Sequence, residues 1–231
     1  GLVSSTDTNG YYEATDGSGA HDRLVYNGTV WTWRDGDTQT TEVYGETTAT
    51  TDGLTSWRIT EVRDSEVDAS GNPVNKLTFA YTANRLTRIL TANNEFTDYA
   101  WDVNNNITSV TTGYLDFQAG NASKSLTRTR YEYDAQNRLA RVIVDLKPEV
   151  AGAITTGSGD TLAGVQYESY VTRYTYVGTT KQIASITQTD GASLAITYDG
   201  SGRVTSLTQT AANGDPRVTE FVYQAGSTLI L

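Results

Sequence analysis

The side chains that could perform catalysis are few in this chain. His21 is the only histidine, with Asp22 beside it, and there is no cysteine. A nucleophile triad would need these two side chains to act together, but neighbouring residues of a β-strand point to opposite faces of a sheet. A zinc site would need several histidines or cysteines. We therefore predict that the chain is not an enzyme and that it holds no cofactor and no metal.

Acidic side chains could serve two other kinds of site. A pair of carboxylates can hydrolyse a glycoside if its surroundings separate the two pKa values, and 27 Asp and Glu residues make some close pair inevitable. Segments 68–72 and 102–106 are rich in Asp and Asn, whose oxygens suit calcium, although neither segment has the spacing of an EF-hand. In both cases we favour the simpler interpretation, which is solvated carboxylates and Asx residues that form turns.

Three tryptophans near the N-terminus are candidates for binding a sugar by stacking. They are Trp31, Trp33 and Trp57. Residues 31 and 33 would face the same side of a strand, as a stacking platform requires. Aromatic residues at alternating positions more often pack within a sheet face, so packing is the favoured interpretation and carbohydrate binding the alternative.

The charge balance bears on possible partners. The chain has 17 Lys and Arg against 27 Asp and Glu, a formal net charge of -10. Phosphate binding requires a basic surface, so we expect no nucleic-acid partner. No apolar run approaches the roughly 20 residues that span a bilayer, so we expect no membrane span. The lack of Cys fits an exported protein, and the absence of a signal-peptide pattern suggests an internal fragment.

Alternating apolar and polar residues predict β-strands throughout the chain. Clear examples are segments 77–81, 130–133 and 193–198. Dipeptides that favour hairpin turns with positive φ separate such segments at 52–53, 190–191 and 213–214. The sequence therefore predicts an all-β fold, an antiparallel meander of hairpins that forms a curved, open sheet strip.

A short motif repeats within this pattern. Its copies share an aromatic strand end, an Asp, a slot for Gly or Asn, and a returning strand; the candidate residues are Tyr131, Tyr133, Asp134, Asn137, Arg138 and Leu139, then Tyr198, Asp199, Gly202, Arg203 and Val204, then Tyr99, Trp101 and Asp102. We predict that the Asp opens a turn and that Asn105, Asn137 and Gly202 adopt positive φ. Leu139 and Val142 share a face only if a bulge lies between them.

The repeats divide the chain into two predicted regions. Residues 1–76 form a divergent β region, and residues 77–231 form the repeat region; the alternative is one continuous domain. Polar loops are predicted at 68–73, 118–125 and 147–164.

Residues 133–139 and 198–204 resemble the YD repeat of bacterial Rhs proteins, Tc toxin shell subunits and animal teneurins. The resemblance implies a long β-sheet strip that spirals into a hollow shell, often around a toxin domain. Asn105 and Asn137 depart from the family's usual Gly, and the self-cleaving segment that ends Rhs cores is absent, so no protease is implied.

The resemblance implies a non-catalytic structural segment of a large bacterial protein, secreted or at the cell surface. Its partners would be flanking repeats of the same polypeptide and an enclosed toxin domain. The alternative is an adhesive or carbohydrate-binding module, with surface glycans as its partner.

Overall fold

The computed structural model describes residues 2–4, 11–14, 22–49, 55–148 and 169–231. His21, the predicted turn at 52–53 and most of the predicted loop at 147–164 lie outside these residues. No helix of the described part is long and apolar enough to cross a membrane.

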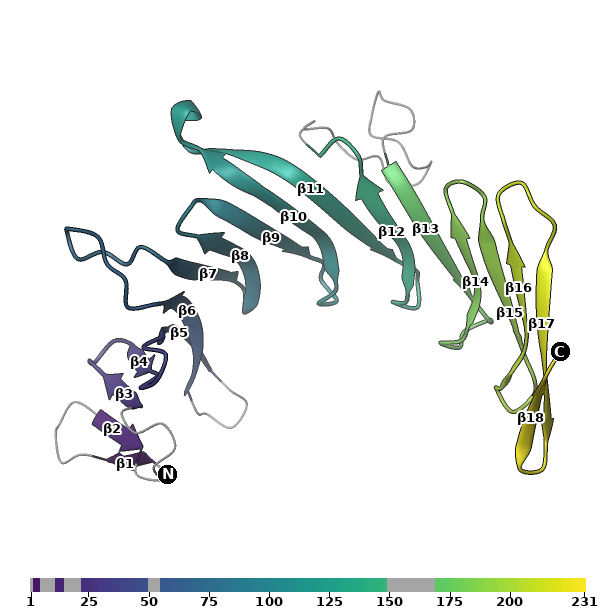
Figure 1. The fold of residues 1–231 in the computed structure, drawn as a ribbon, viewed down its shortest axis with the longest axis horizontal. Helices are drawn as coiled ribbons and strands as arrows, with labels where there is room; N and C mark the ends of the chain where they lie inside the picture. The colour runs from purple at the N-terminus through teal and green to yellow at the C-terminus, as the bar shows by residue number, and fades with distance from the viewer. Residues whose placement is uncertain (1, 5–10, 15–21, 50–54, 149–168) are drawn as a thin grey trace. The chain divides into compact units, whose positions relative to one another are not determined.

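The described residues form β-strands that follow one another in chain order (Figure 1). They are β1 (Leu2–Ser4), β2 (Tyr11–Ala14), β3 (Arg23–Tyr26), β4 (Trp31–Arg34), β5 (Thr41–Ala49), β6 (Thr55–Arg63), β7 (Lys76–Thr82), β8 (Arg85–Thr91), β9 (Glu95–Trp101), β10 (Ile107–Asp116), β11 (Ala122–Tyr133), β12 (Leu139–Asp145), β13 (Ser169–Tyr176), β14 (Ile183–Gln188), β15 (Ser193–Tyr198), β16 (Val204–Thr210), β17 (Arg217–Gln224) and β18 (Ser227–Ile230). Each strand pairs antiparallel with the next, which confirms the predicted all-β meander.

The chain divides into two compact units. The first comprises residues 1–99 and 112–124, and the second comprises residues 100–111 and 125–231. The division passes through β9, β10 and β11, so each of these strands contributes residues to both units.

In the first unit a buried phenylalanine packs where a glycine leaves room for it. Phe96 of β9 is 4% exposed. A Cβ atom added to Gly113 of β10 would lie 2.7 Å from the Phe96 ring and 2.0 Å from the backbone oxygen of Lys124. Only glycine fits this close approach of two strands and a ring.

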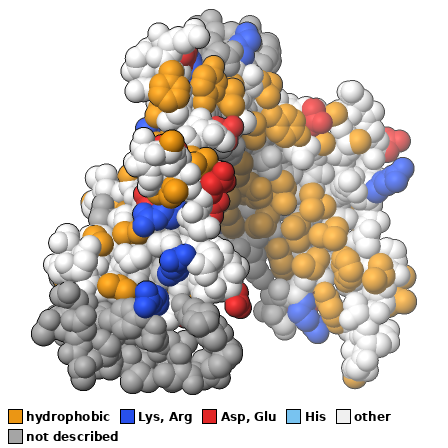
Figure 2. Space-filling view, turned by 60° about the vertical axis from the view of Figure 1, so that its left-hand side comes forward, with side chains coloured by type: hydrophobic (Ala, Val, Ile, Leu, Met, Phe, Trp, Pro, Cys, Tyr) orange, Lys and Arg blue, Asp and Glu red, His pale blue; other side chains and the backbone are white. Residues whose placement is uncertain are grey.

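The sheet of the second unit has two different faces. Side chains alternate along a strand, and the pairing registers place six tyrosines on one side, which we call the tyrosine face: Tyr131, Tyr133, Tyr174, Tyr176, Tyr198 and Tyr223. Aliphatic partners such as Ile186 and Leu207 share this face. Figure 2 shows hydrophobic side chains gathered in a broad patch over C-terminal strands.

The opposite face of the second unit is largely polar, with a small buried centre. Ile143 of β12 and Val171 of β13 are direct partners there and are fully buried. Toward the C-terminus the same face carries hydroxyl pairs, such as Thr175 with Ser185 at 2.6 Å.

Two turns differ from the sequence prediction. The loop expected at 118–125 is shorter, because a 3₁₀ turn (Phe117–Ala119) reverses the chain and β11 begins at Ala122. The Asp116 side chain accepts the first free amides of that turn, and Gly120 takes a positive φ of 66°. The 213–214 turn joins β16 to β17, but neither residue has positive φ, whereas Gly191 has the predicted positive φ.

Candidate functional site: a repeated turn that links successive hairpins

An aspartate closes each repeated turn with its own carboxylate. Oδ1 of Asp134 accepts hydrogen bonds from the backbone N–H groups of Gln136 and Arg138, both at 2.9 Å. The N–H of Asn137 donates to the Asp134 carbonyl, which makes a type I turn followed by a residue of positive φ. Asp199 makes the same pair of bonds at 2.9 Å. The predicted turn-forming role of these aspartates is confirmed.

The positive-φ positions are also those predicted. Asn105, Asn137 and Gly202 have φ values of 67°, 62° and 80°. Asp102 closes the turn that contains Asn105. Its Oδ1 atom accepts hydrogen bonds from the backbone N–H groups of Asn104 and Asn106 at 2.8 and 2.9 Å. Asn tolerates this conformation nearly as well as Gly, so the two asparagines perform the role of the usual glycine.

The turn that was predicted from the Asx residues of segment 68–72 is confirmed, but the sequence analysis did not recognise it as a further copy of the motif turn. Oδ1 of Asp68 accepts from the amides of Ser70 and Asn72 at 2.8 and 2.9 Å, and Gly71 has a φ of 84°. The spacing of Asp68 and Gly71 equals that of Asp199 and Gly202, and this signal could have identified it.

A β-bulge follows the Asp134 turn and explains how Leu139 and Val142 can share a face. Glu132 pairs with Arg141 and Tyr133 with Leu139, so Ala140 is the extra residue. Leu139 and Val142 therefore share the tyrosine face, despite their spacing of three. The same shift occurs where Tyr176 pairs with Ile183 and where Tyr198 pairs with Val204.

The last tyrosine of each repeat donates a hydrogen bond to the preceding hairpin. In the second unit, the hydroxyl groups of four tyrosines each bond the carbonyl of the first residue of a returning strand: Tyr133 to Ile107 at 2.9 Å, Tyr176 to Leu139 at 2.7 Å, Tyr198 to Ile183 at 2.9 Å and Tyr223 to Val204 at 2.8 Å. We call this series the tyrosine ladder. It explains why the motif uses tyrosine and not phenylalanine.

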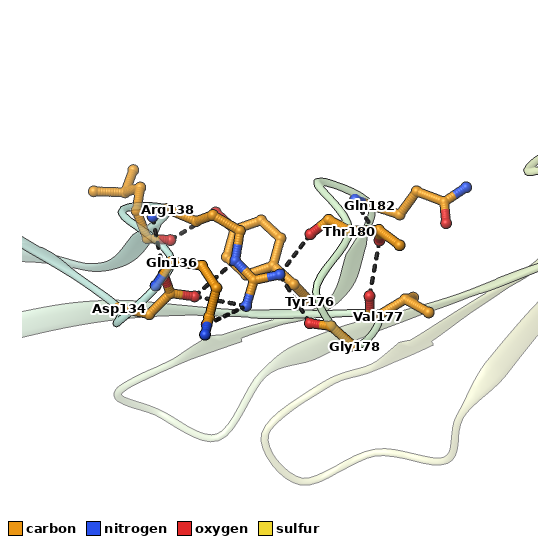
Figure 3. Close-up of polar contacts among 9 residues, drawn as sticks. Asp134, Gln136, Arg138, Tyr176, Val177, Gly178, Thr180 and Gln182 are labelled. Atoms are coloured by element: carbon orange, nitrogen blue, oxygen red, sulfur yellow. Dashed lines mark hydrogen bonds and ion pairs between the residues drawn. The ribbon is translucent and has the colours of Figure 1, made fainter.

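The arginine of the motif contacts the same tyrosine of the next hairpin (Figure 3). The Cζ atom of Arg138 lies 4.3 Å from the centroid of the Tyr176 ring, and Arg203 lies 4.4 Å from that of Tyr223. A guanidinium over an aromatic face is attracted by the ring quadrupole. Because Arg138 immediately precedes Leu139, one tyrosine is held by two consecutive residues, through its ring and its hydroxyl.

The turn aspartate orients the arginine for this contact. Oδ2 of Asp134 accepts from Nε of Arg138 at 2.7 Å, and Oδ2 of Asp199 accepts from Nε of Arg203 at 2.8 Å. Nη1 of Arg138 also donates to the carbonyl of Gly178 at 2.9 Å, in the next turn. The aspartate therefore builds its own turn and aims the side chain that reaches the next one.

Ionisation of these groups follows from their contacts. The Arg138 side chain holds the pKa of Asp134 below its ordinary value, and the backbone amide of Arg203 is the main cause of the lowered pKa of Asp199. Burial is the main cause that raises the pKa of Tyr133 and of Tyr176. At neutral pH the Asp134 and Asp199 carboxylates are therefore charged, and the Tyr133 and Tyr176 hydroxyl groups are protonated.

The opposite face holds an ion cluster that sequence reasoning did not identify. The Asp145 side chain is fully buried and accepts from both Arg128 and Arg130, with an Arg130 Nη2 to Oδ1 distance of 2.9 Å. A buried carboxylate is tolerated only when it is paired in this way. The cluster joins β11 to β12, and no local sequence pattern marks partners that are 15 and 17 residues apart.

The remaining candidate residues are aromatic, and the three that were candidates for sugar stacking belong to the first unit. Trp31 and Trp57 pack on the ring of Tyr26 in the first unit, with centroid distances of 4.9 and 5.6 Å, and Trp33 shares β4 with Trp31. Tyr99 and Trp101 end β9, directly before the Asp102 turn. In the described part of the chain, no three His, Cys, Asp or Glu side chains form a group that could hold a metal ion.

No protein-family model and no curated protein matches the chain. Among solved structures, it is similar to chains of TcdB2-TccC3 without its hypervariable C-terminal region (13% identity, TM-score 0.39), of TcdB2-TccC3-Cdc42 (13%, 0.37) and of TcdB2-TccC3-TEV (14%, 0.37). Each match covers 95% of this chain and 14% of the matched chain. The chain thus spans a small part of the length of these neighbours.

Proposed function

We propose that this chain is a non-catalytic structural segment of a large YD-repeat protein, secreted by a bacterium or displayed on its surface. In that protein it forms part of a shell or scaffold wall, and flanking repeats are its partners. A toxin domain enclosed by the wall is the proposed cargo.

The observation that supports this proposal is that the motif side chains make contacts between neighbouring hairpins. The Tyr, Asp and Arg side chains are engaged in joining one hairpin to the next through the tyrosine ladder and the arginine contacts. Such an array stiffens a sheet of any number of hairpins, because each hairpin contacts only its neighbours. A wall needs this property, and a catalytic site does not.

The first test separates a ladder role from a binding role for the tyrosines. The triple variant Tyr133→Phe, Tyr176→Phe, Tyr198→Phe removes three hydroxyl donors, at about 1 kcal/mol each. We expect a lower midpoint of urea unfolding and faster cleavage by protease under native conditions. The matched control is the double variant Tyr131→Phe, Tyr174→Phe on the same face, which should unfold nearly as the parent does. Equal midpoints in the triple variant and the parent would contradict the proposal.

The second test concerns the alternative function, carbohydrate binding. Contacts of Trp31 and Trp57 with Tyr26 favour a packing role for these rings. We expect no signal on a glycan array and no turnover in an esterase, protease and glycosidase panel. A glycan signal that a Trp33→Ala variant loses while it keeps the parent's unfolding midpoint would establish the binding module instead.

A further inference from the structure

The first unit carries a row of basic side chains that crosses neighbouring strands. From β3 to β7, the direct register partners are, in order, Arg23, Arg34, Thr41, Arg63 and Lys76. Residues directly opposite each other in an antiparallel pair project from the same face of a sheet. The four cations therefore share one face, and we call them the cationic row.

The cationic row retains positive charge after its acidic neighbours are counted. Like charges directly opposite each other destabilise a sheet, and Glu61 relieves part of this repulsion. Its Oε1 atom accepts a hydrogen bond from Nη1 of Arg63 at 2.5 Å, and its Oε2 atom lies 4.0 Å from Nζ of Lys76. Glu13 is the register partner of Arg23. Two glutamates against four cations leave an excess of two positive charges, in a chain whose net charge is -10.

The aspartates next to the three arginines in the sequence take part in turns. Asp35 and Asp64 directly follow β4 and β6, and their N–H groups continue the backbone hydrogen bonding of these strands. Successive residues of a strand point to opposite faces, so these two carboxylates point away from the face of the cationic row. Each accepts a backbone N–H of the following turn at 2.9 Å, and Asp22 accepts the N–H of Gly36 at 2.8 Å. The face of the row is therefore more basic than the surrounding sequence indicates.

The cationic row is accessible and has a defined length. Arg23 and Arg34 are exposed, and the side chains of Arg63 and Lys76 are 35% and 38% exposed. Neighbouring strands lie about 4.8 Å apart, so the row spans about 19 Å. An extended polypeptide advances about 3.3 Å per residue and points every second side chain to the same side, so about seven residues would cover the row. About four of their side chains would then face the cations.

We propose that the cationic row binds an extended acidic segment of a polypeptide, with Asp or Glu at every second position. Guanidinium groups match carboxylates through two parallel hydrogen bonds, and three of the four cations are arginines. A short segment fits better than a long polyanion such as nucleic acid, because a long polymer would extend beyond the row and meet the negative charge of the rest of the chain. This inference does not depend on the proposed shell function.

Peptide binding with a charge-matched control tests the site. The probe is a labelled peptide of about ten residues that alternates Glu and Ser, and its fluorescence anisotropy should rise on adding the protein at about 0.05 M salt but not at about 0.5 M. The double variant Arg23→Gln, Arg34→Gln should bind the peptide about tenfold more weakly, because two exposed ion pairs are lost.

The control is the double variant Lys181→Gln, Arg217→Gln, which removes the same charge from exposed residues of the second unit and should bind like the parent. All four substituted residues are exposed, so the urea unfolding midpoints of both variants should match that of the parent. No binding by the parent, or equal weakening in the two double variants, would overturn the proposal.

Cross-linking locates the peptide on the protein. A carbodiimide couples a carboxylate of the bound peptide to a nearby lysine, and Lys76 is the one lysine of the cationic row. Mass spectrometry should find the peptide attached to Lys76 more often than to Lys124 or Lys181, which are exposed but lie outside the row. Attachment to the three lysines in equal amounts would contradict binding at the row. Displacement of the peptide by an equal concentration of an oligonucleotide of the same charge would overturn the choice of a polypeptide partner.

Discussion

The two units hold a linking tyrosine in the same way but approach it through different turns. In the first unit, Tyr81 donates to the Ile59 carbonyl at 2.8 Å and Arg58 lies 5.2 Å from its ring. In the second, Leu139 and Arg138 make the same two contacts with Tyr176. Arg138 comes from an aspartate turn, whereas Arg58 lies within β6. The tyrosine contact is thus the constant element, and the aspartate turn is one way to supply the arginine.

The turns that follow the linking tyrosines also differ between the two units. After Tyr81 the chain reverses through Ala83 and Asn84, both with positive φ, and no aspartate takes part. After Tyr133 and Tyr198 it reverses through an aspartate turn, although the same register shift, a β-bulge, occurs at all three tyrosines. The first unit has its tight packing elsewhere, at Phe96 and Gly113, so the two units should respond to different substitutions.

The largest expected effect is in the first unit. Gly113→Ala would place a methyl group 2.0 Å from the Lys124 carbonyl oxygen, so strands or the Phe96 ring must shift. We expect a loss of about 3 kcal/mol in the free energy of unfolding, as for an overpacked core. Gly200→Ala is the control, because nothing lies within 4 Å of its added Cβ. Urea unfolding of both variants measures the difference, and equal midpoints would show that the packing at Gly113 is loose.

A smaller effect is expected at a turn of the second unit. Asn137→Val places a β-branched residue at a φ of 62°, at a cost of about 1–2 kcal/mol. Asn137→Gly should lose less than the valine variant, because glycine adopts this φ freely and only the hydrogen bond from Asn106 Nδ2 to Asn137 Oδ1 is removed. A valine variant with an unchanged midpoint would mean that this turn does not limit stability.

The smallest expected effect is on how the free energy of unfolding of the second unit depends on pH under acidic conditions. The pKa values of Asp134 and Asp199 are lowered in the folded state, so their contribution is present above the unfolded pKa, about 3.9, and is lost as pH falls through the folded values. Unfolding free energy should therefore fall with pH below about 4. The double variant Asp134→Asn, Asp199→Asn should show a shallower fall between pH 5 and 2.5. A slope equal to that of the parent would show that neither carboxylate is coupled to folding.

Local features of the repeat could be predicted from the sequence because the chain encodes them locally. Asp134 and Asn137 are three residues apart, and their turn depends on the conformational preferences of the residues between them and of Asn137 itself. The same reasoning reaches Gly202. It would also have identified the Asp68 turn as a copy of the motif, because Asp68 and Gly71 are three residues apart, as Asp199 and Gly202 are.

The contacts between hairpins could not be predicted in this way. That Tyr176 bonds the Leu139 carbonyl depends on the bulge at Ala140, which the spacing of Leu139 and Val142 left as an open question, and on the register of β12 with β13. The ion pairs of Asp145 likewise depend on the register of β11 with β12. Residues far apart in the chain meet only once the meander is formed.

The central claim is that the motif residues join successive hairpins, and the contact of Arg138 with Tyr176 is the most direct place to test it. A double-mutant cycle with Arg138→Gln and Tyr176→Leu measures its coupling free energy by urea unfolding. We predict a favourable coupling of about 0.5–1 kcal/mol, as for a partly exposed cation–π contact. The control cycle of Arg138→Gln with Tyr174→Leu, two residues away on β13, should give a value near zero. Additive effects at Arg138 and Tyr176 would contradict the account, because they would show that the motif does not connect one hairpin to the next.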